Sequence, residues 1–191
     1  MDGRTLELYL ARGRRFELTQ REVAEVAEHL RSTTNDRHRL SCIMILRRQG
    51  SRAHVPLVAP LVHSADTGVA NEAMRFLVRD TERADLCRDT LLEWLADEGE
   101  FSSKPLDAVQ IAGEAYLQLH DERLLREILR LLDHERAESV GASAADSLVV
   151  ALTPEYRRMM PRDSHLLLER ADIADYRRRA EAMLREAPTR P

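Results

Sequence analysis

Side chains that could do chemistry are widely spaced along this 191-residue chain. No two histidines have the His-x3-His spacing that places both imidazoles on one helical face, and neither cysteine belongs to a Cys-x2-Cys pair. His63 and Asp66 are close in sequence, but a histidine at a helix end followed by a capping aspartate explains both. These spacings predict no metal site and no cofactor. The seven histidines are His29, His38, His54, His63, His120, His134 and His165.

Signals for catalysis are also missing from the sequence. There is no Gly-x-Ser-x-Gly motif and no glycine-rich phosphate loop. Cys42 and Cys87 fall at apolar helical positions, which is typical of buried thiols in a reducing compartment. The adjacent carboxylates Asp97 and Glu98 fall in a polar loop with no sign of burial, so we interpret them as solvated. We therefore predict no catalytic residue and a chain that is not an enzyme.

Composition limits the class of protein. The hydrophobic fraction is 43%, which is enough for a folded core, and the aromatic fraction is only 4%, so that core must be aliphatic. The 29 basic and 33 acidic residues give a net charge of −4, which argues against a dedicated nucleic-acid binder. No apolar run approaches the roughly 20 residues of a membrane span, and the N-terminus has no apolar signal core. We expect a cytoplasmic protein with no membrane partner.

One pattern is written twice between Leu40 and Leu95, and the elements follow from it. Leu40, Ile43 and Met44 are followed 30 positions later by Ala70, Ala73 and Met74, and Leu57 and Leu61 are followed at the same offset by Cys87 and Leu91. Each copy reads as an apolar helix, a polar turn and a second helix, which indicates a repeat of helical hairpins.

Local signals place several helices. Thr19 and Glu22 form a capping box before a helix with one apolar stripe, and the helix over 37–49 is apolar nearly all round, which predicts a central position. Pro60 should kink its helix because proline lacks an N–H. Gly113 and Gly141 fall inside predicted helices at a cost of about 1 kcal/mol each relative to alanine, and close helix approach would explain them.

Hairpins with a proline in a first helix and an Ala/Leu-rich second helix resemble HEAT or armadillo repeats. Pro60 and the segments 70–77 and 112–117 carry this likeness. The 30-residue spacing is shorter than the roughly 40 residues of HEAT repeats, and their Asp-Val-Arg turn is missing. We therefore expect an all-α fold: an irregular, right-handed, HEAT-like α-solenoid of about four to five antiparallel helical hairpins. Residues 1–191 would form a single domain, with the clearest repeats over 19–152 and C-terminal capping helices over 153–187.

The resemblance implies a binding surface, because the second helices of successive hairpins line the concave face of an α-solenoid. Residues predicted to point outward there mix acid, amide and arginine, which suits a polar protein surface. The alternative is that they are ordinary solvated faces, and the acidic loop 97–104 is a second candidate contact surface. The predicted protein-binding residues are Asn71, Glu72, Arg75, Gln110, Glu114, Gln118 and Asp146.

The expected function is a non-catalytic protein-binding module or adaptor, in one specific version a bacterial immunity protein that neutralises a toxin. The alternative is a HEAT-like nucleic-acid-binding protein or DNA glycosylase-like enzyme, which would use the arginines at 12, 14 and 15 and those near Arg177. A third possibility is homodimerisation through an apolar C-terminal stripe that comprises Ile173, Tyr176, Ala180 and Met183.

Overall fold

Helix-start signals in the sequence coincide with helix starts in the structure, a computed structural model that describes residues 1–13, 18–49, 52–99, 102–133, 138–153, 155 and 170–186. The Thr19 hydroxyl accepts a hydrogen bond from the Glu22 amide, and the Glu22 carboxylate accepts one from the Thr19 amide, so the predicted capping box is present. Asp66 caps another helix by accepting from the Val69 amide. Every regular element that the described residues form is a helix, which confirms the all-α prediction.

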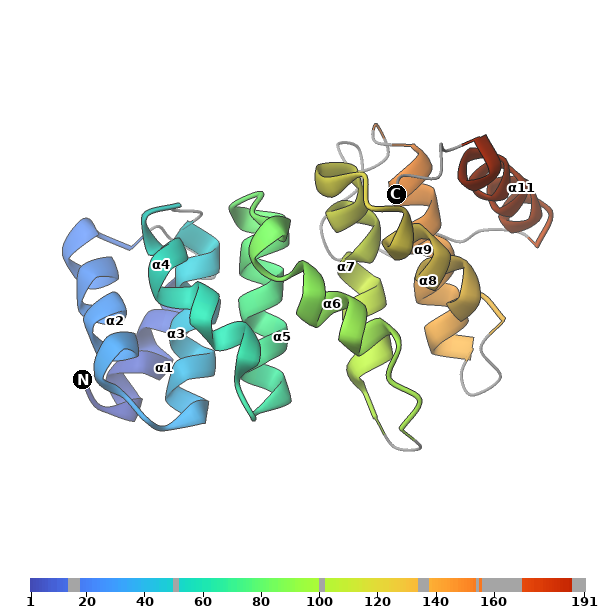
Figure 1. The fold of residues 1–191 in the computed structure, drawn as a ribbon. Helices are drawn as coiled ribbons and strands as arrows, with labels where there is room; N and C mark the ends of the chain where they lie inside the picture. The colour runs from blue at the N-terminus through green and yellow to red at the C-terminus, as the bar shows by residue number, and fades with distance from the viewer. Residues whose placement is uncertain are drawn as a thin grey trace. The chain divides into compact units, whose positions relative to one another are not determined.

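Contacts between Cα atoms divide the chain into an N-terminal unit, Met1–Thr90, and a C-terminal unit, Leu91–Pro191 (Figure 1). The N-terminal unit contains α1 (Gly3–Gly13), α2 (Gln20–Ser32), α3 (Asp36–Gln49), η1 (Arg52–His54), α4 (Val55–Val58), η2 (Ala59–His63), α5 (Thr67–Arg75), η3 (Phe76–Asp80) and η4 (Ala84–Leu86). α6 (Arg88–Leu95) runs across the boundary. The C-terminal unit contains α7 (Lys104–Leu119), α8 (Glu122–Leu131), α9 (Glu138–Leu152) and α11 (Arg170–Glu186). A single domain over 1–191 stays a prediction.

The core of the N-terminal unit forms around α3, which packs against α1, α2 and α5. Cys42, Ile43, Ile45 and Leu46 of α3 are fully buried, as expected for a helix that is apolar on several sides. The 30-residue offset relates α3 to α5, where Ala70, Ala73 and Met74 are also fully buried. The central position predicted for α3 is therefore confirmed.

The segment 55–63 is helical, as predicted, but it contains two types of helix. The α-helix ends at Val58, and a 3-10 helix with Pro60 in its first turn continues from Ala59 to His63. Proline cannot donate the hydrogen bond that would continue the α-helix, and the change of helix type occurs beside Pro60, where the sequence predicts a kink. Val55, Val58 and Val62 enter the core, whereas Leu57 and Leu61 are only half-buried.

In the C-terminal unit, α7 packs against α8 and α9, and α11 packs against both α8 and α9. α7 and α9 approach each other closely at Gly113 of α7, where an added Cβ would lie 2.1 Å from the carbonyl oxygen of Ser147 on α9. The Gly113 amide also donates to Oγ of Ser147 at 2.7 Å. An added Cβ at Gly141 would lie no nearer than 3.3 Å to its neighbours. Close helix approach therefore explains Gly113 well and Gly141 only weakly.

The C-terminal capping helices are described in part. α11 covers the last helix of the predicted 153–187 segment, while 154, 156–169 and 187 lie outside the described residues. Within the part of the chain that the structure describes, no helix is both long and apolar enough to cross a membrane.

Candidate functional site

Charged side chains of the N-terminal unit meet between α3 and α5. Nη1 of Arg47 on α3 lies 2.6 Å from a carboxylate oxygen of Glu72 on α5, and Nε of Arg47 lies 2.8 Å from a carboxylate oxygen of Asp80. The Asp80 side chain is only 2% exposed and that of Arg47 20%. Burial alone would lower the pKa of Arg47, but the charges and hydrogen bonds of the two carboxylates outweigh it and raise that pKa. Arg47 thus carries its charge beside two carboxylates.

A π-helical turn places Asp80. η3 widens the end of the helix that begins as α5, and the amide of Thr81 donates to the carbonyl of Phe76, five residues earlier, at 3.1 Å. The buried Thr81 hydroxyl donates to the carbonyl of Leu77 at 3.1 Å, which satisfies another backbone group at this helix end. Glu82 then adopts a left-handed backbone conformation, with φ of 54°. The hydrogen bonds of Thr81 therefore fix the backbone at the end of η3, where Asp80 lies.

The three predicted binding residues of α5 belong to the same network. Nε of Arg75 donates to the Asn71 side-chain oxygen at 3.2 Å and lies 3.9 Å from a carboxylate oxygen of Glu72. All three side chains are half-buried. We call Arg47, Asn71, Glu72, Arg75 and Asp80 the α3–α5 network. It combines two guanidinium groups, two carboxylates and an amide in fixed positions, so it can present paired donors and acceptors without a net charge.

Sequence reasoning missed Arg47 and Asp80. Arg47 falls near the end of a helix that is otherwise mostly apolar, and its partners lie 25 and 33 positions further along the chain. One signal in the sequence could have indicated the contact. The 30-residue offset predicts that α3 and α5 are neighbours, and a charged residue that is buried between them needs a partner of opposite charge.

The other four predicted binding residues belong to the C-terminal unit. Gln110, Glu114 and Gln118 share one stripe of α7, because they are spaced four residues apart, and Asp146 is on α9. Glu114 is 9% exposed and the other three are half-buried. Glu114 therefore offers little surface to a partner. The seven residues therefore form two groups, and their union into one concave face stays a prediction.

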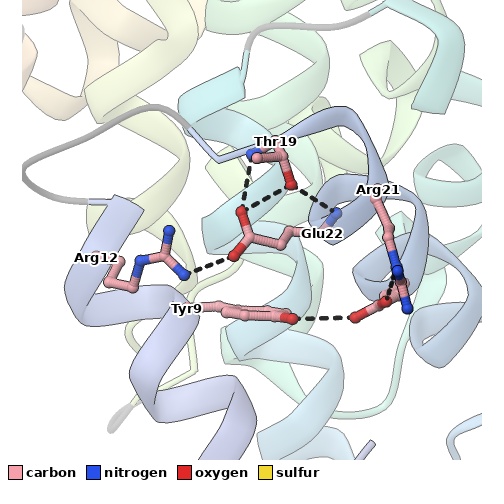
Figure 2. A network of polar contacts seen from close by, with 6 residues as sticks. Tyr9, Arg12, Thr19, Arg21 and Glu22 are labelled. Atoms are coloured by element: carbon pink, nitrogen blue, oxygen red, sulfur yellow. Dashed lines mark hydrogen bonds and ion pairs between the residues drawn. The ribbon is translucent and has the colours of Figure 1, made fainter.

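The arginines of the nucleic-acid alternative are engaged with neighbours in the folded chain. Figure 2 shows Arg12 of α1 beside Glu22 of α2. Nη1 of Arg12 lies 2.5 Å from a carboxylate oxygen of Glu22. The hydroxyl of Tyr9 and the guanidinium of Arg21 both donate to Glu25, at 3.0 and 3.1 Å. Arg14 and Arg15 lie outside the described residues.

Three arginines of α11 also contact neighbouring side chains. Arg177 pairs with Asp133 and with Glu181, and Arg178 donates to Asp175 at 3.0 Å. Arg179 lies over the ring of Tyr176, 5.3 Å from its centroid. This face is mixed in charge, which suits contacts with a protein at least as well as contacts with a phosphate backbone.

The predicted acidic loop is organised by one carboxylate. Asp97 accepts hydrogen bonds from the Gly99 amide at 2.8 Å and the Ser102 hydroxyl at 3.0 Å, and these bonds lower the pKa of its carboxyl group. Lys104 lies 3.5 Å from the same carboxylate and 5.9 Å from the ring centroid of Trp94. Trp94 is 5% exposed, as expected for a core residue. Glu100 and Phe101 of this loop are outside the described residues.

The titratable groups show no metal-binding arrangement in the described residues: they contain no cluster of three or more His, Cys, Asp or Glu side chains that could hold an ion. Burial raises the pKa of Cys42 and of Cys87 to about 12, so both thiols are protonated and weakly reactive. His63 contacts the hydroxyl of Thr90 through Nδ1 at 3.3 Å. His29 and His38 contact each other.

No protein-family model matches this chain, and no curated protein or solved structure matches it significantly. The class that the fold defines is an all-α protein of packed helices, compatible with a helical repeat.

Proposed function

We propose that this chain is a non-catalytic protein-binding module, built as an irregular, right-handed, HEAT-like α-solenoid. The α3–α5 network is the observation that carries the proposal. Its side chains are held in place by one another, so a partner would meet preorganised donors and acceptors and would not have to order flexible side chains. Its two positive and two negative charges are balanced, which favours a polar protein surface over a polyanion.

One specific version is a bacterial immunity protein that binds and neutralises a toxin. The acidic net charge of −4 supports it, because nuclease toxins need basic surfaces to hold nucleic acid. In this version, the module works by covering a surface of the toxin and needs no chemistry of its own.

The test is purification of the tagged chain from its native host, together with two single variants of the predicted surface, Asn71→Ala and Gln110→Ala. We expect a stoichiometric protein to co-purify with the parent chain and its recovery to fall about tenfold in a variant that removes a central contact. Arg21→Ala is the matched control, because the Arg21 side chain is 90% exposed and its ion pair with Glu25 lies within α2. Equal thermal stability of all four proteins shows that the fold is intact.

The result of the co-purification distinguishes the immunity version from a general protein-binding module. A nuclease or other toxin as the bound protein supports the immunity version, whereas a different stoichiometric partner supports only the module. Equal recovery with every variant contradicts the predicted surface, and no partner at all contradicts the protein-binding function. The nucleic-acid and DNA glycosylase-like alternative is tested by a gel shift with duplex DNA, where no shift at low salt would exclude it.

Homodimerisation through α11 is a separate proposal. In the predicted stripe Ala180 is buried, Ile173 and Tyr176 are half-buried, and Met183 is 44% exposed. Part of the stripe therefore already packs inside the C-terminal unit. Light scattering that shows a monomer at high concentration would exclude the dimer.

A further inference from the structure

Two imidazole rings meet where α2 packs against α3. Nε2 of His29 lies 3.2 Å from Nδ1 of His38, and the ring centroids are 5.3 Å apart. Both side chains are half-buried. Gly3 of α1 covers His38 on another side, because a Cβ added to Gly3 would lie 3.3 Å from Nε2 of His38. The contact therefore joins two helices and lies beside a third that packs on α3.

Proton count decides whether this contact can exist. A neutral imidazole has one donor and one acceptor nitrogen, whereas a protonated one has two donors. The pair can bond when both rings are neutral or when one is protonated, because one facing nitrogen donates and the other accepts. When both rings are protonated, two N–H groups and two positive charges face each other. The pair must then separate.

The surrounding charges do not compensate a second proton. Within the described residues, neither ring forms an ion pair or a hydrogen bond with a carboxylate. The positive amino group of Met1 acts on His29 and disfavours its protonation. The carboxylates of these segments have other partners: Asp2 accepts from the Thr5 amide, Glu7 pairs with Arg37, Glu22 with Arg12, Glu25 with Arg21, Glu28 with Arg31, and Asp36 with Arg39.

We propose that His29 and His38 form a proton-responsive joint between α2 and α3, which binds one proton while it is packed and separates to bind the second. Burial, the Met1 amino group and His38 all lower the pKa of His29 from its ordinary 6.5. The unfolded chain binds a proton on each ring near pH 6.5, whereas the packed pair binds fewer. Stability of this contact is therefore present above pH 6.5 and is lost as the pH falls below it. The joint would operate with or without a protein partner.

The direct test is an NMR titration of the imidazole Hε1 resonances of the full chain between about pH 8 and pH 5. We expect the parent pair to take up about one proton in this range. In H38Q, the His29 resonance should titrate at a higher pH than in the parent, because its charged neighbour is gone. Independent titration of both rings, unchanged by removal of either partner, would overturn the proposal.

Thermal unfolding at pH 7.5 and pH 5.5 adds a readout of the contact itself. We expect the melting temperature of the parent to fall more on acidification than that of H29Q/H38Q, since glutamine keeps a donor and an acceptor but does not titrate. H54Q is the matched control: burial also lowers the pKa of His54, but no hydrogen bond or ring contact joins His54 to the pair. H54Q should leave the titration of the pair unchanged. If the melting temperature falls equally on acidification in the parent and in H29Q/H38Q, the proposed joint is contradicted. If the double variant does not fold, the NMR titration of the parent tests the proposal.

Discussion

Replacement of Gly113 by alanine tests the packing of the C-terminal unit most sharply. The added Cβ would lie 2.1 Å from the carbonyl oxygen of Ser147 and 2.9 Å from its carbonyl carbon. Both atoms belong to the backbone of α9, so no change of rotamer relieves the clash. α7 and α9 would have to separate by roughly 1.5 Å for this Cβ to reach ordinary contact distance. That separation also stretches the hydrogen bond from the Gly113 amide to Oγ of Ser147, now 2.7 Å.

The expected magnitude follows from three opposing contributions. Overpacking of a close-packed interior costs about 1–3 kcal/mol. Loss of the buried hydrogen bond costs about 1 kcal/mol more. Alanine raises the free energy of unfolding by about 1 kcal/mol relative to glycine, because it is the better helix former. We therefore expect Gly113→Ala to lower the free energy of unfolding by about 1–3 kcal/mol, which corresponds to a fall in melting temperature of roughly 2–12 °C for a chain of this size.

The assay is thermal unfolding followed by circular dichroism and by the fluorescence of Trp94, the single tryptophan, which is buried in the same unit. Gly141→Ala on α9 is the matched control, because its added Cβ lies 3.3 Å from the nearest atom, the carbonyl oxygen of Leu132. We expect the control to change the melting temperature by no more than about 3 °C. A Gly113→Ala variant as stable as the parent, or a control that is equally damaged, would refute the close crossing of α7 and α9.

Three further substitutions or probes test the N-terminal unit. Thr19→Ala opens the capping box of α2 and should lower the free energy of unfolding by about 1 kcal/mol in a denaturant titration; an unchanged midpoint would contradict the cap. Asp80→Asn removes a buried charge from beside Arg47, and we expect a loss of about 2–3 kcal/mol by the same measurement, whereas a stabilised variant would refute the ion pair. Because the pKa of Cys42 and of Cys87 is about 12, iodoacetamide at pH 8 should modify both only after unfolding, and mass spectrometry that finds rapid alkylation of the native chain would contradict their burial.

Features set by neighbouring residues were predictable from the sequence. The capping box at Thr19 and the interruption at Pro60 depend on groups within one helical turn, so their spacing is visible in the chain. The central position of α3 followed from apolar residues on several of its sides. Which side of 55–63 faces the core was not predictable by the same means, because a change from α-helix to 3-10 helix alters the angle between successive side chains. Val58 and Val62 enter the core there, while Leu57 and Leu61 are only half-buried.

Features set by distant pairs were predicted less well. The three binding residues expected on α5 are indeed linked, because Arg75 follows Glu72 by three positions and Asn71 by four, and both spacings bring side chains together on a helix. Their link to Arg47 and Asp80 required the packing of α3 on α5 and the π-helical turn, neither of which leaves a periodic trace in the sequence. The contact between His29 and His38 also arises from packing, since nine positions separate them.

Pairing of charges is the step that most changes the functional interpretation. In the sequence, Arg12, Arg177 and Arg178 can be counted as free cations for a phosphate backbone, but in the structure each lies beside a carboxylate. An exposed pair of this kind is worth only about 0–1 kcal/mol, so a ligand could displace each carboxylate. The larger effect of the pairing is on the electrostatic field of the surface. A polyanion responds to the summed charge of a surface, and the two charges of each ion pair cancel in that sum. A protein partner needs only local complementarity, which paired charges still supply. For this reason a gel shift at low salt is the most permissive test of the nucleic-acid alternative, and a negative result there would favour the protein-binding proposal.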